Sequence, residues 1–338
     1  MKKQALLIVI FSLVILSVFA QEKEINSTFK PKGKAIVRVF ANYNSNLGGN
    51  EQAGAVDEME IKRAYLGYKS TLNENYSIKL TMDVGNSSGK YSTYLKIAEL
   101  KYKKDNITAH IGMIATKQFK VQEGFWGYRY LLKSFQDEYK YNGSADLGLS
   151  VDYKINKIIS VDAIVQNGEG YKHVDATGTY RGGLGTTINF KPITFRLYYD
   201  ISSKPDVQRQ NISTFIGYKF KKSFRIAGEY NYQLNNAFVE DHNMFGFSVY
   251  TTYIINKKFE VFARYDKSQS NIIEDANASP NMDAQAWNVN KDEGSGIIGL
   301  QYKPLKTVKI SANYRRTLSA IEDAECLGWL FLNLEFKL

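Results

Sequence analysis

The stretch YSIKLTMDV, residues 76–84, alternates strictly between apolar and polar side chains. A period of two residues is typical of a β-strand, whose successive side chains point to opposite faces of the sheet. Here Tyr76, Ile78, Leu80, Met82 and Val84 form an apolar face, and the residues between them form a polar one. One face of this strand must therefore be covered by apolar material, while the other can meet water.

The same alternation recurs from one end of the chain to the other. It is visible in residues 147–153, 159–165, 193–199, 259–265, 308–314 and 330–338. Short connectors fall near residues 73–75, 103–106, 154–157, 191–192, 221–223, 256–258 and 304–306, and between them lie longer polar segments at 45–57, 85–92, 115–144, 167–179, 202–210, 234–243, 267–292 and 317–327. These connectors predict about sixteen strands, with tight turns at one end of the sheet and long loops at the other.

Residues 1–20 have the pattern of a secretory signal peptide. Lys2 and Lys3 precede an apolar stretch from Ala5 to Val18, and the small residue Ala20 stands before Gln21. The apolar stretch is shorter than the ~20 residues that a transmembrane helix needs. We expect export of the chain and a single mature domain covering residues 21–338.

An apolar face on every strand can be covered by a second sheet or by lipid. Regular short turns at one end, strands of about ten residues and aromatic residues near strand ends favour lipid. The sequence therefore predicts an all-β protein, a transmembrane antiparallel β-barrel in the outer membrane of a Gram-negative bacterium. Its short turns would be periplasmic and its long loops extracellular. A soluble secreted β-protein is the alternative.

The polar faces predict a water-filled interior of mixed charge. The 338 residues include 44 Lys and Arg against 34 Asp and Glu, a formal net charge of +10. A barrel of sixteen strands leaves an aqueous channel, through which small hydrophilic solutes can diffuse. The basic residues expected to line it are Arg38, Lys79, Arg196, Arg225, Arg264, Lys309 and Arg315.

The connector at residues 115–144 differs from the other loops because it is rich in large aromatic side chains. A solvated loop has no reason to hold Phe119, Phe125, Trp126 and Tyr128 together, so we expect this loop to fold into the barrel and narrow it. Its basic residues would then stand at the constriction and favour anions: Lys117, Lys120, Arg129 and Lys133. Packing over the barrel mouth or against a neighbouring subunit is the alternative for this loop.

Three short motifs resemble the phosphate-selective porin O and P family in its Bacteroidetes form. They are MEIKRAYLGY at residues 59–68, the stretch from Gly112 to Phe119, and VQNGEG at residues 165–170. The resemblance implies a sixteen-stranded porin, usually a homotrimer, with anion selectivity from basic residues. The family's run of arginines is replaced here by lysines interleaved with acidic residues. We therefore expect general diffusion with a mild anion preference rather than strict phosphate specificity.

Other chemistry has weaker support in the sequence. One cysteine and three scattered histidines do not predict a metal or cofactor site. A barrel hydrolase would need a histidine beside a serine, and the candidates are His110 and the Asp241-His242 pair. A cation site in the acidic loop around Glu274, or a binding protein or adhesin acting through its loops, remain alternatives. The expected partners are outer-membrane lipid, small polar or anionic solutes and further copies of the chain, with no nucleic acid.

Overall fold

The computed structural model covers the whole chain and describes residues 29–47, 58–87, 89–174, 178–221, 223–271, 292–319 and 328–338. The expected signal peptide at 1–20 and the acidic loop around Glu274 lie outside these ranges. Within them, no helix has the length and apolar character required to cross a membrane.

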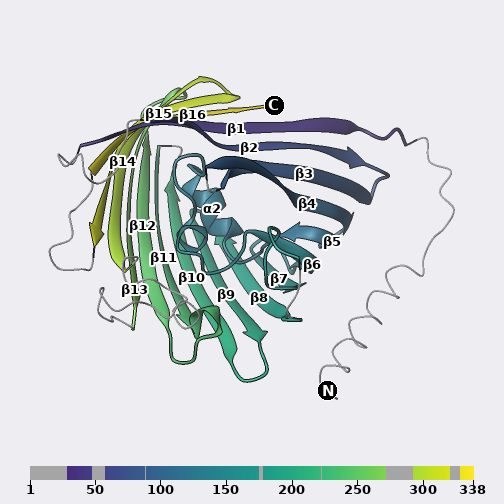
Figure 1. Cartoon of the computed structure of the whole chain (residues 1–338). Coiled ribbons are helices and arrows are strands. Elements are labelled where there is room, and N and C mark those ends of the chain that lie inside the picture. Colours follow the sequence, from purple (N-terminus) through teal and green to yellow (C-terminus); the bar gives the residue numbers. More distant parts are fainter. Residues whose placement is uncertain are drawn as a thin grey trace, which may run out of the picture.

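The described strands form one closed antiparallel barrel in which each strand pairs with its neighbours in sequence and β1 pairs with β16 (Figure 1). This confirms the predicted sixteen-stranded fold. The strands are β1 (Gly33–Asn46), β2 (Glu58–Thr71), β3 (Tyr76–Ser87), β4 (Lys90–Lys104), β5 (Ile107–Ala115), β6 (Ala145–Lys154), β7 (Ile159–Gln166), β8 (Arg181–Phe190), β9 (Ile193–Ser203), β10 (Gln208–Phe220), β11 (Phe224–Leu234), β12 (Met244–Ile254), β13 (Phe259–Ser270), β14 (Glu293–Leu305), β15 (Val308–Ser319) and β16 (Gly328–Lys337).

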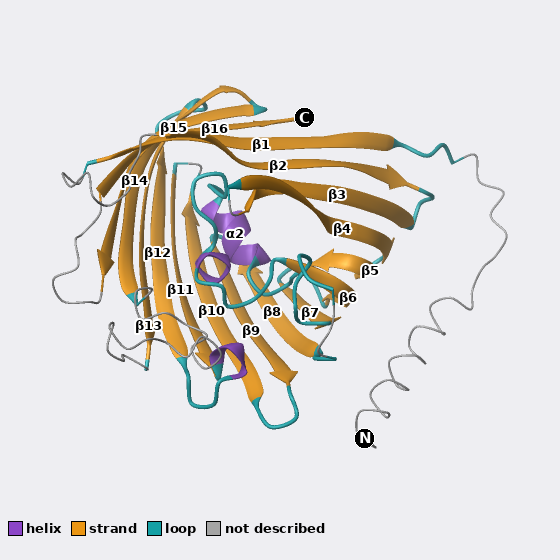
Figure 2. Ribbon diagram, viewed as in Figure 1, coloured by secondary structure: helices purple, strands orange, loops and turns teal. Residues whose placement is uncertain are grey.

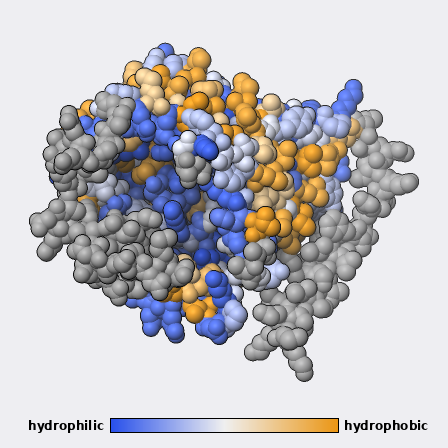
Figure 3. Space-filling view, viewed as in Figure 1, coloured by the Kyte–Doolittle hydropathy of each residue, from blue (hydrophilic) through white to orange (hydrophobic). Residues whose placement is uncertain are grey.

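The predicted faces are the observed ones. Ile78 and Leu80 keep 41% and 47% of their surface exposed on the outer wall, whereas Asp83 on the opposite face is 2% exposed. Figure 3 shows hydrophilic side chains gathered in the hollow of the barrel. The interior is therefore polar, as the alternation requires, and the outward wall is apolar.

Two connectors expected to be long are short. Most of residues 85–92 belong to β3 and β4, which are joined by a tight turn. In this turn the side chain of Asn86 accepts a hydrogen bond from the backbone N–H of Gly89 at 3.1 Å. Gly89 has φ of +76°, which glycine adopts without steric cost. Strands β9 and β10 likewise extend into residues 202–210. Polar composition concealed these extensions, because strand ends beyond the apolar wall need no apolar face.

Two β-bulges interrupt the alternation on neighbouring parts of the wall. Between β1 and β2 the pairing shifts so that Lys62 is the extra residue, and between β3 and β4 the extra residue is Lys96. A bulge re-aims the side chains around it. As a result, consecutive residues such as Lys62 and Arg63 no longer alternate strictly between the two faces.

The long connector between β5 and β6 lies inside the barrel. It contains two short helices, α2 (Lys120–Trp126) and α3 (Phe135–Glu138), and Figure 2 shows α2 within the ring of strands. The first helix ends at Gly127, whose φ of +77° favours glycine and whose N–H donates to the carbonyl of Glu123 at 3.0 Å. A single-turn 3-10 helix, η2 (Asn236–Phe238), follows β11. The aromatic loop thus enters the barrel, as predicted from the sequence.

Candidate channel and constriction

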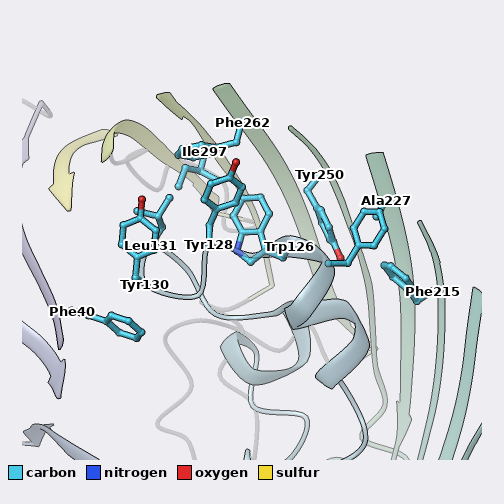
Figure 4. Packing of buried hydrophobic residues seen from close by; sticks show 11 residues of the cluster. Phe40, Trp126, Tyr128, Tyr130, Leu131, Phe215, Ala227, Tyr250, Phe262 and Ile297 are labelled. Atoms are coloured by element: carbon cyan, nitrogen blue, oxygen red, sulfur yellow. The ribbon is translucent and has the colours of Figure 1, made fainter. Parts of the chain in front are cut away.

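The aromatic side chains of the internal loop are buried against one side of the barrel wall. Trp126, Tyr128 and Tyr130 are each 1% exposed, and they share a cluster with wall residues Phe215, Ala227, Tyr250, Phe262 and Ile297 (Figure 4). Edge-to-face contacts join the Trp126 ring to Tyr250 at 5.3 Å and to Phe262 at 6.0 Å. The loop is therefore attached mainly to the side formed by β10 to β14, and Tyr130 extends the cluster to Phe40 on β1 at 6.4 Å.

A wall cation lies over each of four loop rings, and this set of contacts is here called the loop clamp. The four cation–ring pairs are Lys219 with Phe125 at 4.8 Å, Arg225 with Tyr128 at 5.2 Å, Arg264 with Trp126 at 5.2 Å, and Lys309 with Tyr130 at 5.4 Å. Such contacts are worth more when water is excluded. The clamp thus uses inward-facing basic residues to hold the loop.

The loop backbone is also bound by wall cations, two of them members of the loop clamp. Arg225 donates to the carbonyl of Trp126 at 3.1 Å, and Arg264 donates to that of Lys133 at 2.6 Å. Near the start of the loop, Arg196 donates to the carbonyl of Lys117 at 2.8 Å. These bonds satisfy carbonyl groups that a loop without a sheet partner would otherwise leave unpaired.

The loop meets the opposite wall in a cluster of charges, here called the constriction. On the wall, Asp83 pairs with Arg63 and with Lys96, both at 3.2 Å, and accepts a hydrogen bond from the hydroxyl of Tyr171 at 2.6 Å. Tyr65 lies between them and accepts from Arg63 at 3.4 Å and Lys96 at 3.5 Å.

The loop side of the constriction has its own ion pairs. Arg129 pairs with Glu123 and with Asp137, both at 3.2 Å, and Lys120 also pairs with Glu123 at 3.2 Å. Burial works against ionisation of Glu123, but Lys120 and Arg129 outweigh it and lower the pKa of this carboxyl. Asp137 is also buried, and Arg129 lowers its pKa in the same way. Both carboxylates are therefore charged at neutral pH, and the two sides of the constriction carry both signs.

Towards the short turns, the channel opens into a first chamber of about 380 Å³. His110 lies there with its Nδ1 atom 3.1 Å from Glu99, and Lys117 pairs with Asp152 at 2.6 Å. The remaining charged side chains of this chamber are Lys79, Lys120, Asp162 and Arg196. Basic and acidic groups nearly balance here.

A second chamber of about 720 Å³ lies at the short-turn end and shares Lys79 and Glu99 with the first. Its charged side chains are five lysines and one acid: Lys32, Lys34, Lys69, Lys79, Lys101 and Glu99. Lys34 stands directly opposite Lys69, and Lys69 directly opposite Lys79. Like charges opposite each other destabilise a sheet. This arrangement, here called the lysine chamber, breaks a local rule in the way that functional sites do.

The residues predicted from the sequence fall into three groups. Lys79 lines both chambers, and Arg196 lines the first chamber while it also contacts the loop. Arg225, Arg264 and Lys309 face inward but contact the loop. Arg38 and Lys309 share the carboxylate of Glu335, at 2.6 and 2.7 Å, and Arg315 lies 3.8 Å over the ring of Phe331.

Of the loop residues, Lys117, Lys120 and Arg129 are each paired with acids, and Lys133 follows the clamped segment. Sequence reasoning missed Arg63, Lys69 and Lys96. Lys69 could have been found by continuing the alternation through residues 65–69. The other two adjoin the bulges, which a single sequence does not reveal.

Neither candidate histidine forms a nucleophile–base pair. The ring of His110 faces Glu99 and Asp152, and the hydroxyl of its cross-strand neighbour Ser150 has no hydrogen-bond partner. Both ring nitrogens of His242 are likewise unpaired. Among the described residues, no group of His, Cys, Asp and Glu is placed to hold a metal ion.

Comparisons with known proteins match the fold and not the sequence. A scan against protein-family models finds no match, and a comparison with curated proteins finds none either. Among solved structures, the outer membrane channel DcaP of Acinetobacter baumannii is 12% identical, with a TM-score of 0.64 over 93% of this chain and 99% of that one.

Two further solved structures match equally well. OprB of Pseudomonas putida is 11% identical, with a TM-score of 0.68 over 90% of this chain and 94% of that one. An anion-selective porin from Comamonas acidovorans is 10% identical, with a TM-score of 0.65 over 91% and 100%. The chain therefore has the fold of outer-membrane porins.

Proposed function

We propose that this protein is a porin of a Gram-negative outer membrane, through which small hydrophilic solutes diffuse passively with a mild preference for anions. The two connected chambers beside an internal loop carry the proposal. An apolar outer wall suits lipid, and a polar interior suits water and dissolved solutes. Export through the signal peptide at residues 1–20 is part of the same proposal.

The anion preference rests chiefly on the lysine chamber. Among the described residues, Lys34, Lys69 and Lys101 form no ion pair, and Glu99, the one acidic side chain of the chamber, offsets only part of the charge of its five lysines. Fixed charges of one sign in a channel with low-dielectric walls raise the concentration of ions of the opposite sign. The loop residues contribute less, because Lys120 and Arg129 in the constriction and Lys117 in the first chamber each face a carboxylate.

Membership of the phosphate-selective porin O and P family and assembly as a homotrimer are proposed from the sequence resemblance. The mixed charges of the constriction favour general diffusion over strict phosphate selection. Migration of unheated protein on gels and its mass in detergent would test the trimer separately from the channel.

Reversal potentials of the purified protein in planar bilayers test the proposal. Under a KCl gradient at low salt, the wild-type channel should prefer chloride. Replacement of three lysines, Lys34→Glu, Lys69→Glu and Lys101→Glu together, should reverse that preference. The effect should fade near 1 M salt, where the screening length falls to about 3 Å from about 10 Å at 0.1 M.

Lys104→Glu is the matched control, because Lys104 ends β4 at the same end of the barrel and follows the outward-facing alternation of Tyr102. This variant should keep the wild-type reversal potential. A wild-type channel without anion preference at low salt would contradict the role of the lysine chamber, and protein that inserts without conducting would contradict the porin itself.

A further inference from the structure

Two basic side chains stand on the outer wall of the barrel. Lys267 on β13 lies between Asp266 and Ser268, which are both fully buried on the inner face. Arg316 on β15 follows Arg315, whose guanidinium bonds to the inner residue Asn313 at 2.9 Å. Alternation therefore turns Lys267 and Arg316 outward. Away from the short turns, the other outward-facing residues of the described strands are uncharged.

The two cations flank a gap on the strand between them. Lys267 pairs in register with Gly294 of β14, and Arg316 pairs with Gly296. A side chain added at Gly296 would meet nothing within 4 Å, so the wall is hollowed there. Since neighbouring strands lie about 4.8 Å apart and two residues of strand span about 7 Å, Lys267 and Arg316 stand diagonally across this strand and its groove, about 12 Å apart at the backbone.

Aromatic and apolar residues border this groove. Tyr265 is 40% exposed and Leu318 is 39% exposed, and both lie over Gly294, so the open part of the groove is at Gly296. Ile298 and Leu300, which follow along β14 towards the short turns, are 56% and 41% exposed. The groove thus combines two cations, offset by two residues along the strands, with an apolar surface next to it.

The position along the strands places the cations at the long-loop end. Lys267 lies three residues before the end of β13, and Arg316 three residues before the end of β15. Three residues of strand span roughly 10 Å. In the proposed orientation this is the depth of the outer-leaflet headgroups. Basic residues on the lipid face cost little at that depth, whereas they are unfavourable near the midplane.

Neither cation has an ion-pair partner in the described part of the chain. Long basic side chains with free charges at headgroup depth are suited to anionic headgroups. We propose that Lys267, Arg316 and the groove at Gly296 bind one phosphorylated glycolipid of the outer leaflet. Its phosphate would lie between the two cations and its acyl chains along Ile298 and Leu300. This inference rests on the proposed outer-membrane location but not on the selectivity of the channel.

Lipid retention by the purified protein tests the site. The protein in detergent is titrated with bisphosphorylated lipid A and, separately, with the same lipid after enzymatic removal of its phosphates, and bound lipid is counted by native mass spectrometry. Wild-type protein should retain the phosphorylated form preferentially. The double variant Lys267→Gln with Arg316→Gln should bind it about tenfold more weakly, on the order of one charge-assisted hydrogen bond.

Two further variants separate charge, groove and fold. Lys104→Gln removes an outward-facing lysine at the other end of the barrel and should bind lipid A as the wild type does. Gly296→Leu keeps both cations but fills the groove, and should also weaken binding. All variants should keep wild-type conductance, so that a failed porin and a failed lipid site give different results. Equal retention of the dephosphorylated lipid, or unchanged binding by the double variant, would overturn the proposal.

Discussion

Asp83 shows how one carboxylate organises the wall side of the constriction. Its two oxygens contact Arg63, Lys96 and the hydroxyl of Tyr171, which come from three separate parts of the chain. The alternation in residues 76–84 predicts that Asp83 faces the channel. The alternation does not predict that Arg63 and Lys96 face Asp83, because the bulge at Lys96 and the bulge beside Arg63 shift the register of their strands by one residue.

Replacing Asp83 with Asn should strengthen the anion preference. The change keeps the shape of the side chain but leaves Arg63 and Lys96 without their carboxylate. One unit charge acts on a passing ion with about 1 kcal/mol at 4 Å in water, roughly a factor of five for each ion and of opposite sign for chloride and potassium. The chloride-to-potassium permeability ratio should therefore rise at low salt by roughly fivefold to 25-fold. Bilayer reversal potentials measure this ratio.

Asp105→Asn provides the control for this substitution. Asp105 lies in the turn after β4 with φ of +48°, a conformation that Asn also adopts. It should leave the permeability ratio unchanged. If Asp83→Asn behaves like this control, the ion pairs of Asp83 do not face the path of the ions.

At the level of elements, the sequence predicts that the internal loop lies inside the barrel, but not which strands it packs against. Aromatic side chains such as Trp126 need a surface to pack against, and the barrel interior is the surface within reach. The sequence does not say which strands supply that surface. Arg225 and Arg264 were expected to line the channel, but they act in the loop clamp. The sequence cannot distinguish the two roles, because an inward-facing cation occupies the same position in the alternation whether it lies over a ring or faces water.

Shortening Trp126 to Ala should loosen the loop. The ring contacts Tyr128, Tyr250 and Phe262 and lies under Arg264, so its removal should cost about 3–5 kcal/mol of packing and leave a cavity. Single-channel conductance should rise and fluctuate more. Limited proteolysis within residues 116–144 should become faster than in the wild type.

Trp329→Ala is the comparison for that variant. Trp329 lies on β16, where its ring contacts Phe331. Its loss should leave the susceptibility of the loop unchanged. Equal proteolysis of the two variants would mean that Trp126 does not hold the loop in place.

At the scale of the whole molecule, the fold follows from a simple repeated requirement. Each strand has an apolar face, and closing β1 onto β16 leaves no unpaired edge. The two-residue periodicity of residues 76–84 and of the equivalent stretches therefore predicts the barrel, the number of its strands and the side chains that face its interior. It does not predict where strands extend beyond the apolar wall, as β3 and β4 do, because polar extensions and polar loops have similar compositions.

The lysine chamber makes the channel electrically asymmetric along its length. The constriction sets four cations, Arg63, Lys96, Lys120 and Arg129, against three carboxylates with which they pair, whereas the short-turn end carries an excess of unpaired lysines. A pore with fixed charge at one end accumulates mobile ions under one polarity of voltage and is depleted of them under the other. The protein should therefore act as a weak rectifier. Current–voltage curves in symmetric dilute KCl should be curved, and they should become straight in concentrated salt, where the charges of the chamber are screened.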